Sequence, residues 1–249
     1  MIVDAHVHSG TFDGSRAMAS SELVEMLAGL GVDKGLVSTS SGLRSSCKDS
    51  RADNDRLARF VGLHSEQLRA FCTVNPMDGE AAVSELRRCV EVHGMIGLKL
   101  HPWLQGFSVS DDYINPLVEE CIDRKVPILF HDGTPPYCTP LQIGFLAGRY
   151  PESTVLLGHS GLNDLWRNAI QAAKRFPNVL LCACGPPMHA IYEMAVQVGS
   201  DRMMFGSDVG AAAEPGLVAY RKEKIEKLPI PAEDQAKILG ETARRWFNL

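Results

Sequence analysis

The sequence predicts a single-domain α/β protein with the (β/α)8 (TIM) barrel fold. Short runs rich in Val, Ile, Leu and Phe alternate along the chain with segments of helical periodicity. About eight such repeats fit into the 249 residues, and no linker or low-complexity tract marks a second domain. The apolar runs are nearly continuous, which is typical of parallel strands covered on both faces. The alternative is a doubly wound open sheet, and we expect residues 1–249 to form one domain.

Each predicted strand precedes a predicted helix. The strands are expected at residues 1–7, 35–40, 68–75, 95–101, 126–131, 154–160, 178–184 and 202–208. The helices are expected at residues 20–30, 53–67, 79–94, 111–125, 140–150, 164–176 and 188–199, followed by a last helical pair that begins near Ala213 and Pro231. Ser20 and Asp53 suit the N-caps of the first two helices, and Gly94 suits the C-cap of the third.

Composition and charge narrow the class of partner. Lys and Arg number 25 against 30 Asp and Glu, and this formal net charge of -5 gives no sign of a nucleic-acid footprint or a polybasic membrane contact. We therefore expect a small-molecule partner, with no nucleic acid and no membrane. The helix faces permit a homodimer without requiring one.

The sequence also predicts a cytoplasmic location. No apolar stretch approaches the roughly 20 residues that span a bilayer, and the N-terminus lacks the regions of a signal peptide. The 7 cysteines are odd in number and scattered, as expected for reduced thiols rather than a disulfide framework. Cys182 and Cys184 form a C-x-C pair, which we interpret as two small buried hydrophobic residues rather than a soft-metal site.

Polar residues gather at the carboxyl ends of the predicted strands. His6 and His8 close the first apolar run, and in an extended strand both side chains point to one face, with Asp4 behind them. Three later runs end in histidine and the eighth ends in aspartate; these residues are His101, His131, His159 and Asp208. In a (β/α)8 barrel these ends meet at one mouth, where active sites are built. The sequence therefore predicts a metal site at this mouth.

Side-chain alternation predicts which apolar residues share a face with these polar ones. Leu129 is expected on the face of His131, and Val155 and Leu157 on the face of His159. Each polar residue would then be the last inward-pointing member of an apolar row.

Five motifs in this order, DAHVH, GLKLHP, LFHDG, LGHSG and FGSD, resemble those of the amidohydrolase superfamily. The residues of these motifs most resemble those of the amidohydrolase-2 branch of TIM-barrel metal-dependent hydrolases. This branch also contains decarboxylases similar to aminocarboxymuconate-semialdehyde decarboxylase. The likeness extends from Met1 to the terminal ILGETARRWFNL. Because the chain starts directly at the first strand, we do not expect the small β-sandwich that many amidohydrolases add.

Position by position, the resemblance implies metal ligands at His6, His8, His131 and Asp208. His159 would contact metal-bound water or a second metal. Neutral imidazoles with a carboxylate and one open position suit Zn²⁺, with Mn²⁺ or Fe²⁺ as alternatives. Such an ion lowers the pKa of bound water from about 15.7 toward about 7. Asp208 would accept a proton from that water and His159 would steady an oxyanion, so both are candidate catalytic residues.

Lys99 bears on the number of metal ions. One ion is favoured over two because the closer branch is generally mononuclear. In some related binuclear enzymes, however, a lysine of the fourth strand is carboxylated and bridges two metals. An uncharged or cationic Lys99 would instead bind substrate, and His101 on the same strand face would line the pocket. Asp4 would either orient a ligand imidazole or be a buried polar group bound to the backbone.

Two further residues are candidates for substrate binding. Arg44 follows the second strand and would grip an anionic substrate, although a solvated loop explains it equally well. Trp103 lies near the predicted mouth, where it would line a pocket for a planar or apolar group or simply pack the loop down.

Three functional classes remain open. The leading one is metal-dependent hydrolysis of an amide, ester or lactone bond in a small substrate, which Arg44 would suit if the substrate is anionic. The alternative is nonoxidative decarboxylation of an aromatic or enoic acid, a C–C lyase reaction that the same ligand set permits. A noncatalytic binding barrel is third, and the intact polar residues at the strand ends argue against it. Serine hydrolysis is disfavoured because GHSGL lacks the G-x-S-x-G spacing.

Overall fold

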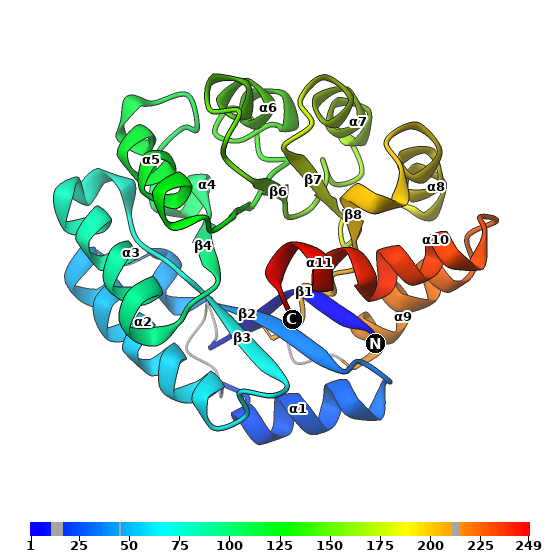
Figure 1. Cartoon of the computed structure of the whole chain (residues 1–249), viewed down its shortest axis with the longest axis horizontal. Helices are drawn as coiled ribbons and strands as arrows, with labels where there is room; N and C mark the ends of the chain where they lie inside the picture. Colours follow the sequence, from blue (N-terminus) through cyan, green and yellow to red (C-terminus); the bar gives the residue numbers. More distant parts are fainter. Residues whose placement is uncertain (11–16, 45, 211–214) are drawn as a thin grey trace.

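The computed structural model of the chain describes residues 1–10, 17–44, 46–210 and 215–249. Eight parallel strands lie side by side in the order β1 to β8, with helices around them (Figure 1). Backbone hydrogen bonds close the sheet: Ala5 N donates to Phe205 O at 2.9 Å, and Asp208 N donates to His6 O at 2.8 Å. The fold is therefore the predicted single-domain (β/α)8 barrel and not an open sheet.

The strands are shorter than the predicted ranges, so most of the polar residues lie just beyond the strand ends. They are β1 (Val3–Ser9), β2 (Lys34–Thr39), β3 (Leu68–Cys72), β4 (Gly97–Leu100), β5 (Ile128–Phe130), β6 (Val155–Leu157), β7 (Val179–Cys182) and β8 (Met203–Met204). The main helices are α1 (Ser20–Gly29), α2 (Cys47–Gly62), α3 (Glu80–His93), α5 (Asn115–Arg124), α6 (Pro140–Arg149), α7 (Trp166–Arg175), α8 (Met188–Gln197) and α9 (Pro215–Glu226). Shorter elements are η1 (Ser41–Arg44), η2 (Pro76–Asp78), α4 (Pro102–Gln105), η3 (Asp112–Ile114), η4 (Ser200–Arg202), α10 (Ala232–Ala236), the π-helix η5 (Lys237–Glu241) and α11 (Thr242–Phe247).

Two predicted N-caps are wrong. Helix α2 begins at Cys47, well before Asp53, whose side chain is buried within the helix and accepts a hydrogen bond from Ser41 Oγ at 3.4 Å. Helix α1 has Ala19 rather than Ser20 at its N-cap. Gly94 is the C-cap of α3 in the left-handed conformation, as predicted. The expected start near Ala213 lies outside the described residues.

The apolar residues form two layers. The larger one lies between the strands and the surrounding helices, and the smaller one fills the barrel interior. Helix α11 lies over the middle of the barrel on the side of the N-terminus (Figure 1). Its residues Ala243 and Phe247 belong to the interior layer, and the Phe247 ring meets Phe71 edge-on at 5.6 Å. This end of the barrel is therefore closed by apolar packing.

The predicted alternation of inward- and outward-facing side chains is confirmed on some strands and wrong on others. Leu129 belongs to the interior layer, which agrees with the prediction for the face of His131. Val155 and Leu157 instead belong to the outer layer, so the prediction for the face of His159 is wrong. Because β6 ends at Leu157, its alternation does not continue to His159.

Strand β1 contains an irregularity that brings residues of both parities to the interior. Its register against β2 shifts between Asp4 and Val7. Val3 and Ala5 belong to the interior layer, whereas Val7 belongs to the outer one. A bulge reverses the alternation in this way, so the side chains of His6 and His8 also point inward past it.

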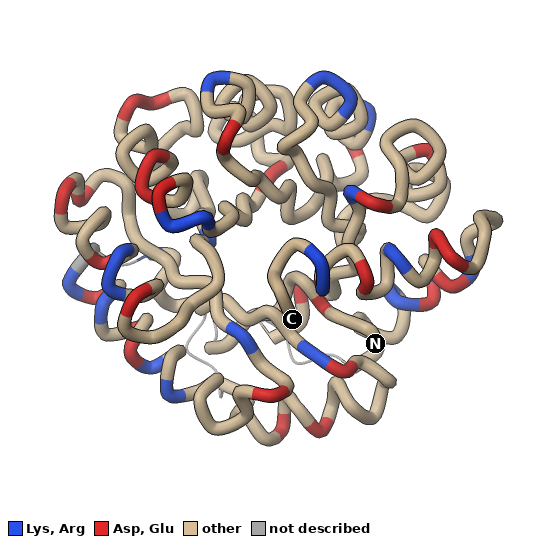
Figure 2. Tube along the Cα trace, in the orientation of Figure 1, with Lys and Arg blue, Asp and Glu red and all other residues tan. Residues whose placement is uncertain are grey.

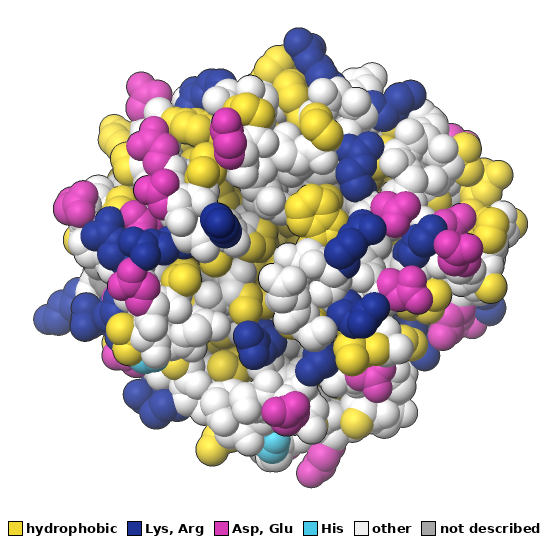
Figure 3. Space-filling view, viewed as in Figure 1, with side chains coloured by type: hydrophobic (Ala, Val, Ile, Leu, Met, Phe, Trp, Pro, Cys, Tyr) yellow, Lys and Arg dark blue, Asp and Glu magenta, His cyan; other side chains and the backbone are white. Residues whose placement is uncertain are grey.

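Charged residues of both signs are spread over the outer helices and loops (Figure 2). On the face seen in Figure 3, basic and acidic side chains are interspersed with hydrophobic ones. Within the described ranges, none of the helices combines the length and apolar character needed to cross a bilayer.

Candidate active site

His6, His8 and Asp208 bring three ligand-type atoms together at the carboxyl end of the barrel. His8 Nε2 lies 3.2 Å from His6 Nε2 and 3.1 Å from Asp208 Oδ1, and His6 Nε2 lies 3.5 Å from Asp208 Oδ1. Two atoms bonded at about 2.0 to 2.1 Å to one tetrahedral ion lie roughly 3.3 Å apart. The three atoms already have the spacing of ligands around a single divalent cation.

Hydrogen bonds to the other ring nitrogens fix the tautomers of both histidines. His6 Nδ1 donates to the carbonyl oxygen of Gly158 at 3.0 Å. His8 Nδ1 lies 3.2 Å from Ser38 Oγ, and the Ser38 hydroxyl donates to Val7 O at 3.4 Å, so its oxygen accepts from the imidazole. Each Nε2 therefore carries a lone pair, as metal coordination requires.

Asp4 does not orient either imidazole. Its Oδ1 accepts backbone hydrogen bonds from His6 N at 3.1 Å and Ser207 N at 2.9 Å, while its buried Oδ2 has no hydrogen-bond partner within the described part of the chain. Burial raises the pKa of Asp4 to about 7. Of the two interpretations from sequence, attachment to the backbone is therefore confirmed, and Gly158 and Ser38 orient the rings.

The electrostatics of the cluster suit a cation. Burial, with help from the nearby Lys99, holds the pKa of His6 well below its usual range, so His6 is neutral. Burial alone would raise the pKa of Asp208, but the contact with His8 and the other adjacent imidazoles hold it well below its usual range. The donor set is thus two imidazoles and one carboxylate, which fits Zn²⁺ or Mn²⁺.

Local backbone geometry places these side chains. Asp208 has a positive φ of 60°, an unusual conformation for a residue with a side chain. A Cβ atom on Gly206 would lie 2.9 Å from His6 Cβ, and one on Gly158 would lie 3.0 Å from His6 Cε1. Glycine at both positions therefore leaves the space that the His6 side chain occupies.

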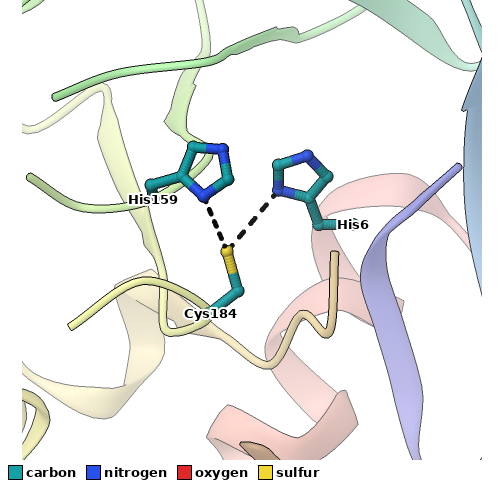
Figure 4. A group of neighbouring side chains, drawn as sticks. All are labelled: His6, His159 and Cys184. Atoms are coloured by element: carbon teal, nitrogen blue, oxygen red, sulfur yellow. Dashed lines mark hydrogen bonds between the residues drawn. The ribbon is translucent and has the colours of Figure 1, made fainter. Parts of the chain in front are cut away.

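His159 and Cys184 form a second group with His6 (Figure 4). Cys184 Sγ lies 3.2 Å from His159 Nδ1 and 3.8 Å from His6 Nδ1, and the thiol donates to Gly158 O at 2.8 Å. The thiol proton is thus directed at Gly158, and His159 Nδ1 donates to the sulfur. Burial lowers the pKa of His159 to about 4, so its ring is neutral with a lone pair on Nε2.

Cys184 is buried as expected, but its role is polar rather than purely apolar. Burial raises the pKa of its thiol well above the usual range, and the thiol proton is already bound to Gly158 O. His6 Nδ1, the third atom of this group, is already bound to Gly158 O. The group therefore orients His159 and does not suit a second ion.

Asp132 is a residue of the site that the sequence analysis missed. Its carboxylate accepts hydrogen bonds from His159 N and Gly161 N, each at 2.6 Å. It is fully buried, and burial raises its pKa to about 6. The turn that Asp132 binds has positive φ at Ser160, Gly161 and Leu162. Asp132 thus fixes the turn that carries His159, and the signal was present in LFHDG, where only the histidine was considered.

His131 lies beside the cluster but belongs to neither ligand group found among the described residues. Its ring meets His159 edge-on, with centroids 4.4 Å apart, and its Nε2 lies 3.0 Å from Thr134 Oγ1. To coordinate an ion through Nε2, His131 would have to break its hydrogen bond with Thr134 Oγ1.

His101 and Trp103 continue the row of rings outward. His101 stacks on His131 with centroids 3.7 Å apart and 10° between the planes. Burial lowers the pKa of His101 to about 2, so it is neutral. Trp103 lies 6.2 Å from the His101 ring and is 54% exposed. Arg44 is exposed in η1, which follows β2 at the same end of the barrel.

Lys99 is buried against the cluster, with its Nζ 3.0 Å from His6 Nε2. Burial lowers the pKa of this amine. Thr73 Oγ1 donates to Lys99 O at 2.9 Å and holds the strand end in place. A charged ammonium at this distance would repel a cation bound to His6, so metal binding requires Lys99 to be neutral or paired with an anionic group.

The barrel and its mouth define the class of protein: a (β/α)8 enzyme with a candidate site for a divalent metal. The chain belongs to the amidohydrolase family, because the family model described as Amidohydrolase (Amidohydro_2) matches residues 3–249. It is thus an enzyme of the amidohydrolase superfamily, as the motifs predicted.

Its curated relatives are distant. The chain is 24% identical to the 2-keto-4-carboxy-3-hexenedioate hydratase of Sphingobium sp. (strain NBRC 103272 / SYK-6), covering 80% of this chain and 71% of the hydratase. It is 23% identical to the gamma-resorcylate decarboxylase of Rhizobium sp. (strain MTP-10005), covering 83% of this chain and 78% of that enzyme.

Solved structures share the fold. The 2,6-dihydroxybenzoate decarboxylase from Rhizobium superposes with a TM-score of 0.78 at 17% identity, covering 99% of this chain and 98% of that one. The dihydroxybenzoic acid decarboxylase from Polaromonas sp. JS666, with bound manganese and the inhibitor 2-nitroresorcinol, gives 0.78 at 17% identity, covering 100% and 97%. Membership of this family supports a divalent metal.

Proposed function

We propose that this enzyme is a divalent-metal-dependent carboxy-lyase that decarboxylates a small aromatic or enoic acid without a redox cofactor. The observation that carries the proposal is the spacing of His6 Nε2, His8 Nε2 and Asp208 Oδ1, all within 3.5 Å of one another. The relatives named above are decarboxylases and a hydratase, which favours lyase chemistry over the hydrolysis first expected. Their named substrates carry a carboxylate on an unsaturated carbon skeleton.

The proposed ligands are His6, His8 and Asp208, with His131 as a fourth that would give up its bond to Thr134. When bound, the metal would supply a Lewis acid that holds substrate oxygen atoms and stabilises negative charge. The donor set suits Zn²⁺, the ion expected first, and Mn²⁺, which is bound in relatives. We propose a single ion because, in the second group, His6 Nδ1 and the Cys184 thiol are both hydrogen-bonded to Gly158 O.

The remaining chemistry falls to the chain itself. The reaction R–COO⁻ + H⁺ → R–H + CO₂ breaks one C–C bond and needs one proton at carbon. Asp208 is ionised and partly exposed, so it can pass this proton from solvent to the carbon atom that loses CO₂. His159 presents a neutral Nε2 that can hold a proton, and Lys99 can pair with the substrate carboxylate.

The test is an assay panel on protein stripped of metal and reloaded separately with Zn²⁺, Mn²⁺ or Fe²⁺. The panel contains hydroxybenzoic acids, unsaturated dicarboxylic acids, lactones and amides, and the readouts are CO₂ release and acid release. We expect CO₂ from at least one acid, only in reloaded protein. Acid release from a lactone or amide without CO₂ from any acid would replace the proposal with hydrolysis.

A further inference from the structure

His101 differs from His6, His8 and His159 in the nitrogen that carries its proton. His6, His8 and His159 each use Nδ1 as a donor within the protein, so each has a bare Nε2. In His101 the backbone N–H of Leu104 donates to Nδ1, at 3.4 Å. A nitrogen that accepts a hydrogen bond bears no proton, so the proton of this neutral ring is on Nε2.

The His101 ring is held in this orientation from several sides. Its Nδ1 caps the short helix α4, and its backbone N–H donates to Gln105 Oε1 at 2.7 Å. The same Gln105 side chain donates to Val74 O at 2.7 Å, which ties the ends of β3 and β4 together. One ring face is covered by His131 at 3.7 Å. A ring flip would place Cδ2–H against the Leu104 N–H and lose this hydrogen bond, so the orientation is fixed.

Among the described residues, the Nε2–H of His101 has no hydrogen-bond partner. The buried polar side-chain atoms without a partner in this part of the chain are Asp4 Oδ2, Ser40 Oγ, Asp78 Oδ2 and Trp246 Nε1, and His101 Nε2 is not one of them. The atom is therefore reachable by a ligand, although His101 as a whole is only 7% exposed.

We propose that His101 is a substrate-recognition residue whose Nε2–H donates to an anionic oxygen of the substrate acid, either a carboxylate or a phenolate. The mouth then has two kinds of imidazole: bare Nε2 atoms that select a cation, and one fixed N–H donor that selects the anion held beside it. Because a neutral donor can serve an anion without repelling the metal, it suits this position better than a second ammonium. The inference rests on the proposed function for the identity of the site.

Two substitutions of His101 separate its two ring nitrogens. In His101→Asn the side-chain Oδ1 takes the place of Nδ1, so the cap on Leu104 is kept while the Nε2 donor is removed. In His101→Gln the amide NH₂ reaches the region of Nε2, so a donor is kept while the cap is lost. A merely structural role would make His101→Gln the more damaging change, whereas recognition predicts the reverse for binding.

The experiment measures the Kd of three probes by calorimetry on manganese-loaded wild type and both variants. The probes are 2,6-dihydroxybenzoate, benzoate, which lacks the phenols, and 2-nitroresorcinol, which lacks the carboxylate. We expect His101→Asn to weaken 2,6-dihydroxybenzoate binding about 10- to 100-fold, as for a lost hydrogen bond to a charged group, with unchanged metal content. His101→Gln should weaken it less than about threefold. The probe that shares the His101→Asn loss identifies the oxygen that is bound.

Two results would overturn the inference. One is a His101→Asn variant that binds every probe within about twofold of wild type, and the other is a wild type that binds none of them. Long-range ¹H–¹⁵N spectra of histidine-labelled protein must also place the His101 proton on Nε2. If His101-dependent binding is found but no acid in the panel releases CO₂, the carboxy-lyase proposal fails while the recognition role stands.

Discussion

The two ends of the barrel are built from opposite chemistry on the same eight strands. At the amino end, Phe247 of α11 packs onto Phe71 in a layer of apolar side chains. At the carboxyl end, His6, Lys99 and Asp132 are equally buried, and each is polar or ionisable. Burying such groups costs free energy unless they are paired, whereas burying apolar groups is favourable. The closed end therefore stabilises the fold that holds the mouth together.

The largest expected effect is at the mouth. His6→Ala/His8→Ala removes two of the three clustered ligand atoms and should abolish stoichiometric metal binding. Activity should fall by more than about 100-fold, the upper range for loss of outer-shell partners alone. Because the apolar layers are untouched, the variant should stay folded. Elemental analysis and circular dichroism check both statements.

The matched control is His64→Ala, since His64 follows α2 at the opposite end of the barrel. It should keep its metal. Equal metal content in wild type and the double variant would remove the basis of the candidate site.

At the closed end, Phe247→Ala should lower the free energy of unfolding by about 3 to 5 kcal/mol, because it leaves a cavity against Phe71. Denaturant titration measures this loss, and Phe247→Leu should recover part of it. Metal content and activity per folded molecule should stay near those of wild type. A large loss of metal in folded Phe247→Ala would show that the two ends are not independent.

The free energy of unfolding of the metal-free protein should depend on pH, because ionisable groups are buried at the carboxyl end of the barrel. The pKa values of His6, His101, His131 and His159 are lowered by burial, so below about 6.5 the unfolded chain binds protons that the folded one does not. These four histidines therefore lower the free energy of unfolding as the pH falls below about 6.5. Asp4 and Asp132, with pKa values raised to about 7 and about 6, act in the opposite direction.

Four imidazoles bind protons mainly in the unfolded chain, and two carboxyl groups bind them mainly in the folded one. The unfolded chain therefore binds about two more protons than the folded chain. Between about pH 6 and 4, the free energy of unfolding should therefore fall by about 1 to 3 kcal/mol per pH unit. In His101→Asn one such group is gone, and the slope should be shallower by about 1 kcal/mol per pH unit. Urea titrations at several pH values measure both slopes. A flat profile would mean that the buried imidazoles are not neutral.

The smallest effect concerns Ser38, which accepts from His8 Nδ1. Ser38→Ala leaves that nitrogen without its partner and should weaken metal binding about 10- to 100-fold without unfolding the protein. Competition with a chelator of known affinity gives the value. Ser153→Ala is the matched control, because it also removes a buried hydroxyl, one that donates to Tyr150 O far from the mouth. Equal metal affinity in both variants would contradict the orienting role of Ser38.

Much of the fold was predictable because it depends on local pattern. Continuous apolar runs marked all eight strands, and Gly94 marked the end of α3. The bulge in β1 and the outward-facing Val155 and Leu157 were not predictable, because each depends on pairing with neighbouring strands. Asp53 looked like an N-cap in the sequence, yet tertiary contacts extend α2 to begin before it.

The partners of the site residues were the least predictable part. The carbonyl that orients His6 belongs to Gly158, 152 residues away, and the sequence offered Asp4 instead. Asp132 was overlooked because its role is to hold backbone N–H groups of another loop. Contacts of this kind leave no periodic signal in either segment.

By itself, the sequence determined that eight apolar strands would bring histidines and an aspartate to one end, because strand order and strand ends follow from local periodicity. Only the tertiary structure decided which nitrogen of each imidazole faces the mouth. That choice depends on the single donor or acceptor beside the other nitrogen, such as Gly158 O for His6 or Leu104 N for His101. This one hydrogen bond determines whether the ring can bind a cation or donate to an anion.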